Sequence, residues 1–142
     1  MNARFADALR EKREQIRMRW IEIMLVDPAD TPRVELRSLV YLIDHTLDEI
    51  LGALPRVLTR RRLLPVAKPD CRCGDNPYLP YFRAGRLALF EALVWFQAGL
   101  KHLDPDERDA AFAALCTAVD RVAGREIGNF AEQCDRRHEA TA

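Results

Sequence analysis

Apolar residues recur every three to four positions along almost the whole chain, and this spacing restricts the fold more than any other feature. A repeat near 3.6 residues places apolar side chains on one face of an α-helix, whereas a half-buried strand alternates at every second residue. The alternating pattern is nearly absent. The sequence therefore predicts an all-α protein, and its 142 residues fit a single helical domain spanning 1–142.

Prolines and cap residues divide this periodic sequence into four predicted helices. They cover about residues 4–26, 31–54, 76–103 and 104–137. Pro28 ends the first helix and Pro55 stops or kinks the second, because proline lacks a backbone N–H and restricts the residue before it. Asn76 and Asp104 are predicted N-caps. We therefore expect a four-helix bundle of up-down-up-down topology, with a long connection (55–76) between the second and third helices.

The third predicted helix carries apolar and aromatic side chains on more than one face. Gly85 is expected to allow a neighbouring helix to approach closely, because glycine has no side chain. Tyr81 and Trp95 lie off the main apolar stripe of this helix. A helix that is apolar nearly all round is buried on several sides. We therefore expect Tyr81 and Trp95 to belong to a dimer surface or to line a pocket.

Two of the four cysteines, Cys71 and Cys73, lie one residue apart in the long connection. The third and fourth predicted helices are joined by a turn near residue 103 and must pack antiparallel, so the start of one lies level with the end of the other. This register brings Cys71 and Cys73 level with Cys134, and His138 lies one turn further on the same face. Three cysteines and one histidine form a complete ligand set for a structural zinc ion.

Other interpretations of these thiols stay open. Cys71 and Cys73 can be ordinary loop thiols and Cys134 a packing residue, which is the commonest role of an isolated helical cysteine. Without metal, a disulfide between Cys134 and either loop cysteine would fasten the connection to the last helix and act as an oxidation switch. Cys116 is expected to be a separate buried thiol, because the helix places it roughly 27 Å from Cys134.

The long connection is also rich in arginine, with Arg56, Arg60, Arg61 and Arg62 at its start. Such a cluster can bind an anion, a nucleic acid or an acidic partner surface. It can equally be a solvated loop that is balanced by acidic residues elsewhere. The chain as a whole has 22 basic and 22 acidic residues, so no overall charge recruits nucleic acid or a membrane, and we expect neither as a partner.

The sequence contains no recognisable targeting signal or catalytic motif. Its first residues are charged throughout and lack the apolar core of a signal peptide, and its longest apolar runs are too short to cross a bilayer. We therefore expect a cytoplasmic protein with reduced thiols. No nucleophile elbow, phosphate-binding glycine loop or zinc-protease motif occurs, and we expect no enzymatic activity.

Two stretches resemble a known family. The segment LREKREQIRMRWIEIM (9–24) resembles the opening helix of RsbRD-type N-terminal sensor domains, and NPYLPYFRAGRLALFEAL (76–93) resembles their internal motif. The resemblance implies an all-helical input module of bacterial signalling, of the kind attached to histidine kinases or stress-response regulators. The 142 residues hold no kinase or other output sequence, and the family motif does not require the Cys-Arg-Cys-Gly segment.

Together these features predict a non-enzymatic sensory or regulatory module that acts through a protein partner or a homodimer. Its expected signal is zinc occupancy or thiol oxidation at the cysteine cluster. The alternative is a helical bundle that binds a small ligand or an anion, which an apolar cavity with convergent polar groups would favour.

Overall fold

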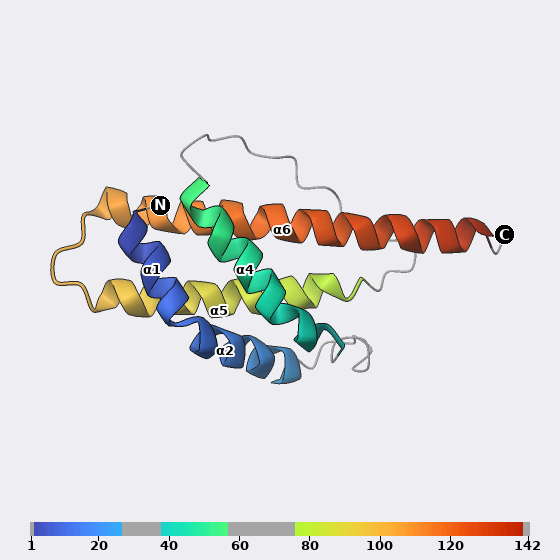
Figure 1. Cartoon of the computed structure of the whole chain (residues 1–142), viewed down its shortest axis with the longest axis horizontal. Helices are drawn as coiled ribbons and strands as arrows, with labels where there is room; N and C mark the ends of the chain where they lie inside the picture. The colour runs from blue at the N-terminus through green and yellow to red at the C-terminus, as the bar shows by residue number, and fades with distance from the viewer. Residues whose placement is uncertain (1, 27–37, 57–75, 141–142) are drawn as a thin grey trace.

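The computed structural model describes residues 2–26, 38–56 and 76–140, except for the side chain of His138. Every regular element in these ranges is helical, so the predicted all-α class is confirmed (Figure 1). The elements are α1 (Ala3–Glu11), α2 (Arg13–Val26), η1 (Val40–Leu42), α4 (Ile43–Ala53), η2 (Leu54–Arg56), α5 (Tyr78–Ala98) and α6 (Pro105–Ala140). In these ranges no helix has both the length and the apolar character needed to cross a membrane.

The first predicted helix is wrong in one respect, because it is two helices rather than one. The chain leaves α-helical geometry at Lys12, whose N–H still bonds to the Ala8 carbonyl, and α2 begins one residue later. The break lets the two halves pack in different directions (Figure 1). Phe5 of α1 meets Phe96 near the end of α5 edge-to-face, whereas α2 lies along the middle of α5.

The ends of the remaining helices follow local chemistry. The side chain of Asn76 accepts a hydrogen bond from the Tyr78 N–H at 3.1 Å, and that of Asp104 accepts one from the Asp106 N–H at 3.2 Å, as predicted for N-caps. Pro55 lies in the short 3₁₀ turn that follows α4, so its predicted stop is confirmed. The third helix ends at Ala98 rather than near residue 103, because Gly99 forms its C-cap and glycine has a low helix propensity.

Helices α5 and α6 form a long antiparallel hairpin, and the other helices pack onto it (Figure 1). The Tyr78 and Phe130 rings lie 6.0 Å apart near one end, and Arg86 pairs with Asp120 nearer the middle. These contacts agree with the register expected from a turn near residue 103. The last turns of α6 extend beyond α2 and α4 (Figure 1).

The centre of the core is the contact between Trp20 of α2 and the N-terminal half of α5. The Trp20 indole is fully buried and its Nε1 donates a 2.9 Å hydrogen bond to the Tyr81 carbonyl. It lies directly against Gly85, where a Cβ would be only 2.3 Å from the indole ring. The predicted close approach at Gly85 is therefore confirmed, and the neighbour is α2.

Candidate functional site

The predicted thiol site falls mostly on residues that the structure does not describe. Cys71 and Cys73 lie outside the described ranges, and so does the side chain of His138. Cys134 is half-buried in α6. In the described ranges no group of three or more His, Cys, Asp or Glu residues is arranged to hold a metal ion. The zinc site and the thiol switch therefore stay predictions.

The described residues show which contacts α6 makes just before Cys134. The side chain of Asn76 donates a 3.1 Å hydrogen bond to the Ile127 carbonyl, and the Tyr78 ring contacts Phe130. These contacts hold the start of α5 against α6, one to two turns before Cys134. Ile127 and Phe130 are half-buried like Cys134, so the three residues share a partly covered stripe of α6.

Cys116 has different surroundings. It is half-buried rather than fully buried as expected, because it lies at the edge of the α5–α6 contact. The guanidinium of Arg86 donates to its Sγ at 3.9 Å and also pairs with Asp120. Cys116 is therefore a useful reference thiol on the same helix as Cys134.

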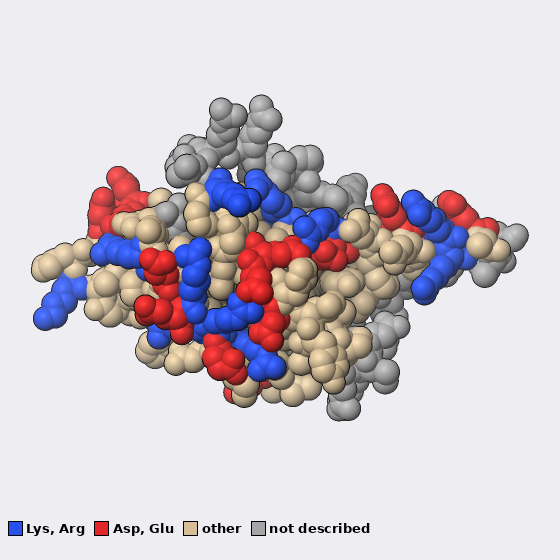
Figure 2. All heavy atoms as spheres, viewed as in Figure 1, with Lys and Arg blue, Asp and Glu red and all other residues tan. Residues whose placement is uncertain are grey.

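The predicted arginine cluster cannot be assembled from the described residues. Arg56 is exposed at the end of η2, and Arg60, Arg61 and Arg62 lie outside the described ranges. On the face shown in Figure 2, basic and acidic side chains are interleaved over α1, α2 and α4. This mixture matches the neutral total charge and forms no broad patch of one sign there.

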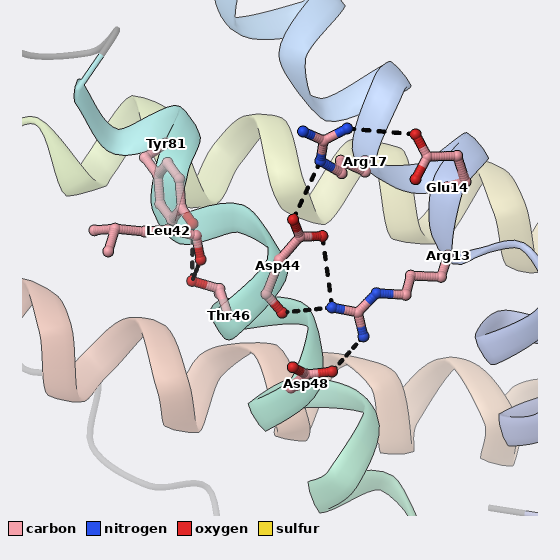
Figure 3. Close-up of polar contacts among 8 residues, drawn as sticks. All are labelled: Arg13, Glu14, Arg17, Leu42, Asp44, Thr46, Asp48 and Tyr81. Carbon is pink, nitrogen blue, oxygen red and sulfur yellow. Dashed lines mark hydrogen bonds and ion pairs between the residues drawn. The ribbon is translucent and has the colours of Figure 1, made fainter.

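A network of ion pairs between α2 and α4, which sequence reasoning missed, includes several of these charges (Figure 3). Arg13 pairs with Asp48 and donates to the Asp44 carbonyl at 2.9 Å. Arg17 pairs with Asp44 at 3.4 Å and with Glu14 at 3.3 Å. The hydrogen bond from Arg13 lowers the pKa of the Asp48 carboxyl below its ordinary value. These exposed pairs position α2 against α4.

A second polar contact lies in the core, where Tyr81 is fully buried. The prediction that Tyr81 belongs to a surface or a pocket is therefore wrong. Its hydroxyl lies 2.8 Å from Thr46 Oγ1, and Thr46 Oγ1 donates to the Leu42 carbonyl at 2.9 Å (Figure 3). Because Thr46 has only one hydroxyl proton, Tyr81 must be the donor between them. Burial raises the pKa of Tyr81, so this hydroxyl stays protonated and joins α4 to α5.

Trp95 is 75% exposed and borders an open groove, as one of its two predicted roles requires, whereas its role in a dimer surface stays a prediction. It lies on the outer surface formed by α2 and α5, where two open grooves of about 360 and 400 Å³ flank a pair between Arg19 and Glu91. Arg19 donates to both carboxylate oxygens of Glu91, at 2.8 and 3.1 Å. These hydrogen bonds lower the pKa of Glu91. Trp95 borders one groove, and Leu87 and Val26, both exposed, border the other.

No protein-family model, curated protein or solved structure matches this chain significantly. The resemblance to RsbRD-type sensor domains therefore stays a prediction from the two sequence segments that suggest it.

Proposed function

We propose that the chain is a non-enzymatic sensory or regulatory helical module of the cytoplasm. Its described helices would form a four-helix bundle in which α1 and α2 together are the first arm and α4, α5 and α6 are the others. The input would be zinc binding or thiol oxidation where α5 begins and α6 ends. The RsbRD-type resemblance, which implies an input module, favours the same role.

One observation carries this proposal, namely the attachment of Asn76 to α6. Cys73 precedes Asn76 by three residues, and three residues span at most about 11 Å. Cys134 follows Ile127, the partner of Asn76, by seven residues of helix, or about 10 Å. The chain between Cys73 and Asn76 is therefore long enough for Cys73 to reach Cys134, which supports a shared site.

The proposed chemistry uses soft ligands. Thiolates of Cys71, Cys73 and Cys134, with the imidazole of His138, would bind zinc tetrahedrally, with zinc–sulfur distances near 2.3 Å. In the absence of metal, hydrogen peroxide would convert two thiols into one disulfide and two water molecules. Either event would fasten the segment before α5 to α6 and change the surface offered to a protein partner.

The test is zinc content and thiol titration of the purified protein and of two variants. We expect about one zinc ion per chain in the wild type and its loss in Cys134→Ser, because a missing ligand opens the site. Cys116→Ser is the matched control on the same helix, and it should keep its zinc. Disulfide mapping after peroxide treatment of the metal-free protein should link Cys134 to Cys71 or Cys73.

The proposal fails if the wild type holds no zinc and peroxide forms no disulfide at Cys134. It also fails if Cys134→Ser and Cys116→Ser lose metal to the same extent, because the metal would then not report the proposed site.

A further inference from the structure

The outer surface of α2 and α5 has a feature that the thiol site does not use. Large apolar side chains project from it, with Trp95 75% exposed, Val26 78% exposed and Leu87 49% exposed. Beside them lie the two open grooves, whose floors on α5 are made by small residues, Ala88 and Ala92 in one and Ala84 in the other. Projections and recesses therefore occur on one face, which we call the α2–α5 face.

We propose that the α2–α5 face binds a second copy of this chain across a twofold axis that passes beside Glu91. A twofold interface is formed by the same patch on both copies, so the patch must complement itself after a half-turn. Trp95 follows Glu91 by four residues and Leu87 precedes it by four. Two α5 helices packed antiparallel about Glu91 thus place Trp95 of each copy over Leu87 of the other.

The shape of the grooves agrees with this arrangement. The half-turn brings each exposed indole to the groove of about 400 Å³ that Ala84, Leu87 and Val26 border. An aromatic side chain that fills such a recess buries a large apolar area and is the usual anchor of a protein interface. By the same symmetry, the side chain of Leu87 of the second copy lies at the groove that Trp95 borders.

The charges also complement themselves. The centre of the face holds one cation and one anion, Arg19 and Glu91, joined by two hydrogen bonds. About the axis the two pairs would lie together, two arginines and two glutamates in all, so that the centre of the interface carries no net charge. Towards the ends, Lys12 borders one groove, and Glu22 and Arg83 border the other. The half-turn therefore brings Lys12 towards Glu22 of the second copy. A surface of one sign would repel its own copy, whereas this one does not.

The experiment is sedimentation equilibrium of the full chain from low micromolar to several hundred micromolar concentration, under reducing conditions. We expect a monomer–dimer equilibrium in the wild type. Trp95→Ala and Leu87→Glu should each weaken self-association by about thirtyfold or more, as expected for a buried anchor. Tyr41→Ala is the matched control, because Tyr41 is an aromatic residue that is 88% exposed and borders neither groove. It should associate like the wild type.

A charge exchange tests the axis itself. Arg19→Glu alone should weaken the dimer, because it would gather four carboxylates at the centre, and Arg19→Glu combined with Glu91→Arg should restore it. Circular dichroism of every variant checks that the helices are intact. A wild type that stays monomeric throughout overturns the proposal, and so does a dimer that persists in both Trp95→Ala and Leu87→Glu. Neither result depends on zinc or on Cys134, so the proposed thiol input is tested separately.

Discussion

At the scale of single residues, the contact between Gly85 and Trp20 is the most sensitive point of the core. We predict that Gly85→Ala lowers the free energy of unfolding by about 1–3 kcal/mol, the usual cost of overpacking. Alanine normally stabilises a helix by up to about 1 kcal/mol relative to glycine. Here the added Cβ would lie 2.3 Å from a fully buried indole, so the steric cost exceeds that gain.

Gly52→Ala is the matched control, because a Cβ at this exposed position of α4 meets nothing within 4 Å. It should stabilise the protein by about 0.5–1 kcal/mol through helix propensity alone. Urea unfolding followed by circular dichroism measures both variants. If both variants changed the free energy of unfolding equally and in the same direction, the Trp20 indole would have moved away at no cost. The packing at position 85 would then not require glycine.

Periodicity predicts which side chains turn inward, but it does not identify the partner that a polar group meets. Gly85 was predicted as a point of close approach, because a glycine amid large apolar residues of a helix usually has a packing reason. The burial of Tyr81 was not predicted. Its hydroxyl is satisfied by Thr46, which lies 35 residues away in the sequence, and no local pattern reports such a pairing.

At the scale of helices, Asn76 has two structural roles. It caps α5 through the Tyr78 N–H and donates to the Ile127 carbonyl of α6, and it is 4% exposed. We predict that Asn76→Ala lowers the free energy of unfolding by about 1–3 kcal/mol, because it removes a cap of α5 and a buried side-chain hydrogen bond to α6. Chemical denaturation of the purified variant measures this loss.

Asn129→Ala provides the comparison, since Asn129 is an exposed residue within α6. It should leave stability unchanged or raise it by a few tenths of a kcal/mol, because alanine is the better helix former. Hydrogen exchange adds an independent readout. In Asn76→Ala the first turn of α5 should exchange faster, and unaltered protection there would contradict the proposed attachment to α6.

The ends of the helices could be predicted where a single residue determines them, and the break at Lys12 could not. Asn76, Asp104 and Pro55 act through their own backbone and side-chain chemistry, which the sequence displays directly. No proline or glycine marks residue 12, and Leu9 and Ile16 on either side of it are seven residues apart, which keeps them on one face of a continuous helix. The chain bends there because α1 and α2 pack on different parts of α5, which is a tertiary effect.

At the scale of the whole molecule, the sequence predicts the hairpin of α5 and α6 and its register, since a short connection between two long helices leaves few alternatives. It does not predict the grooves of the α2–α5 face. Their recesses arise from Ala84, Ala88 and Ala92, which only become a surface once α2 lies beside α5. The thiol site differs from the grooves, because the register of the two helices predicts it from the sequence. Of its four residues, the structure describes the side chain of Cys134 alone.

The stability of the folded protein depends on pH, because exposed pairs between arginines and carboxylates join α2 to α4. The pKa of Asp48 is lower in the folded protein than its ordinary value of 3.8, owing to the hydrogen bond from Arg13. As the pH falls towards 3.8, the carboxyl of Asp48 therefore takes up a proton in the unfolded chain before it does so in the folded protein. The stability that this pair supplies is present at neutral pH and is lost as the pH falls below about 5 towards the folded pKa.

We therefore predict that Asp48→Asn lowers the melting temperature slightly at neutral pH and makes its decline in acid shallower than in the wild type. Thermal unfolding at a series of pH values from neutral to about pH 3 measures both effects, and raised salt should shrink the difference. Asp48 borders neither groove of the α2–α5 face, so self-association does not enter the result. Glu11→Gln, on the exposed surface of α1, controls for the loss of one carboxylate. Acid profiles for Asp48→Asn and the wild type that stay parallel to pH 3 would show that the pair between Arg13 and Asp48 adds no stability.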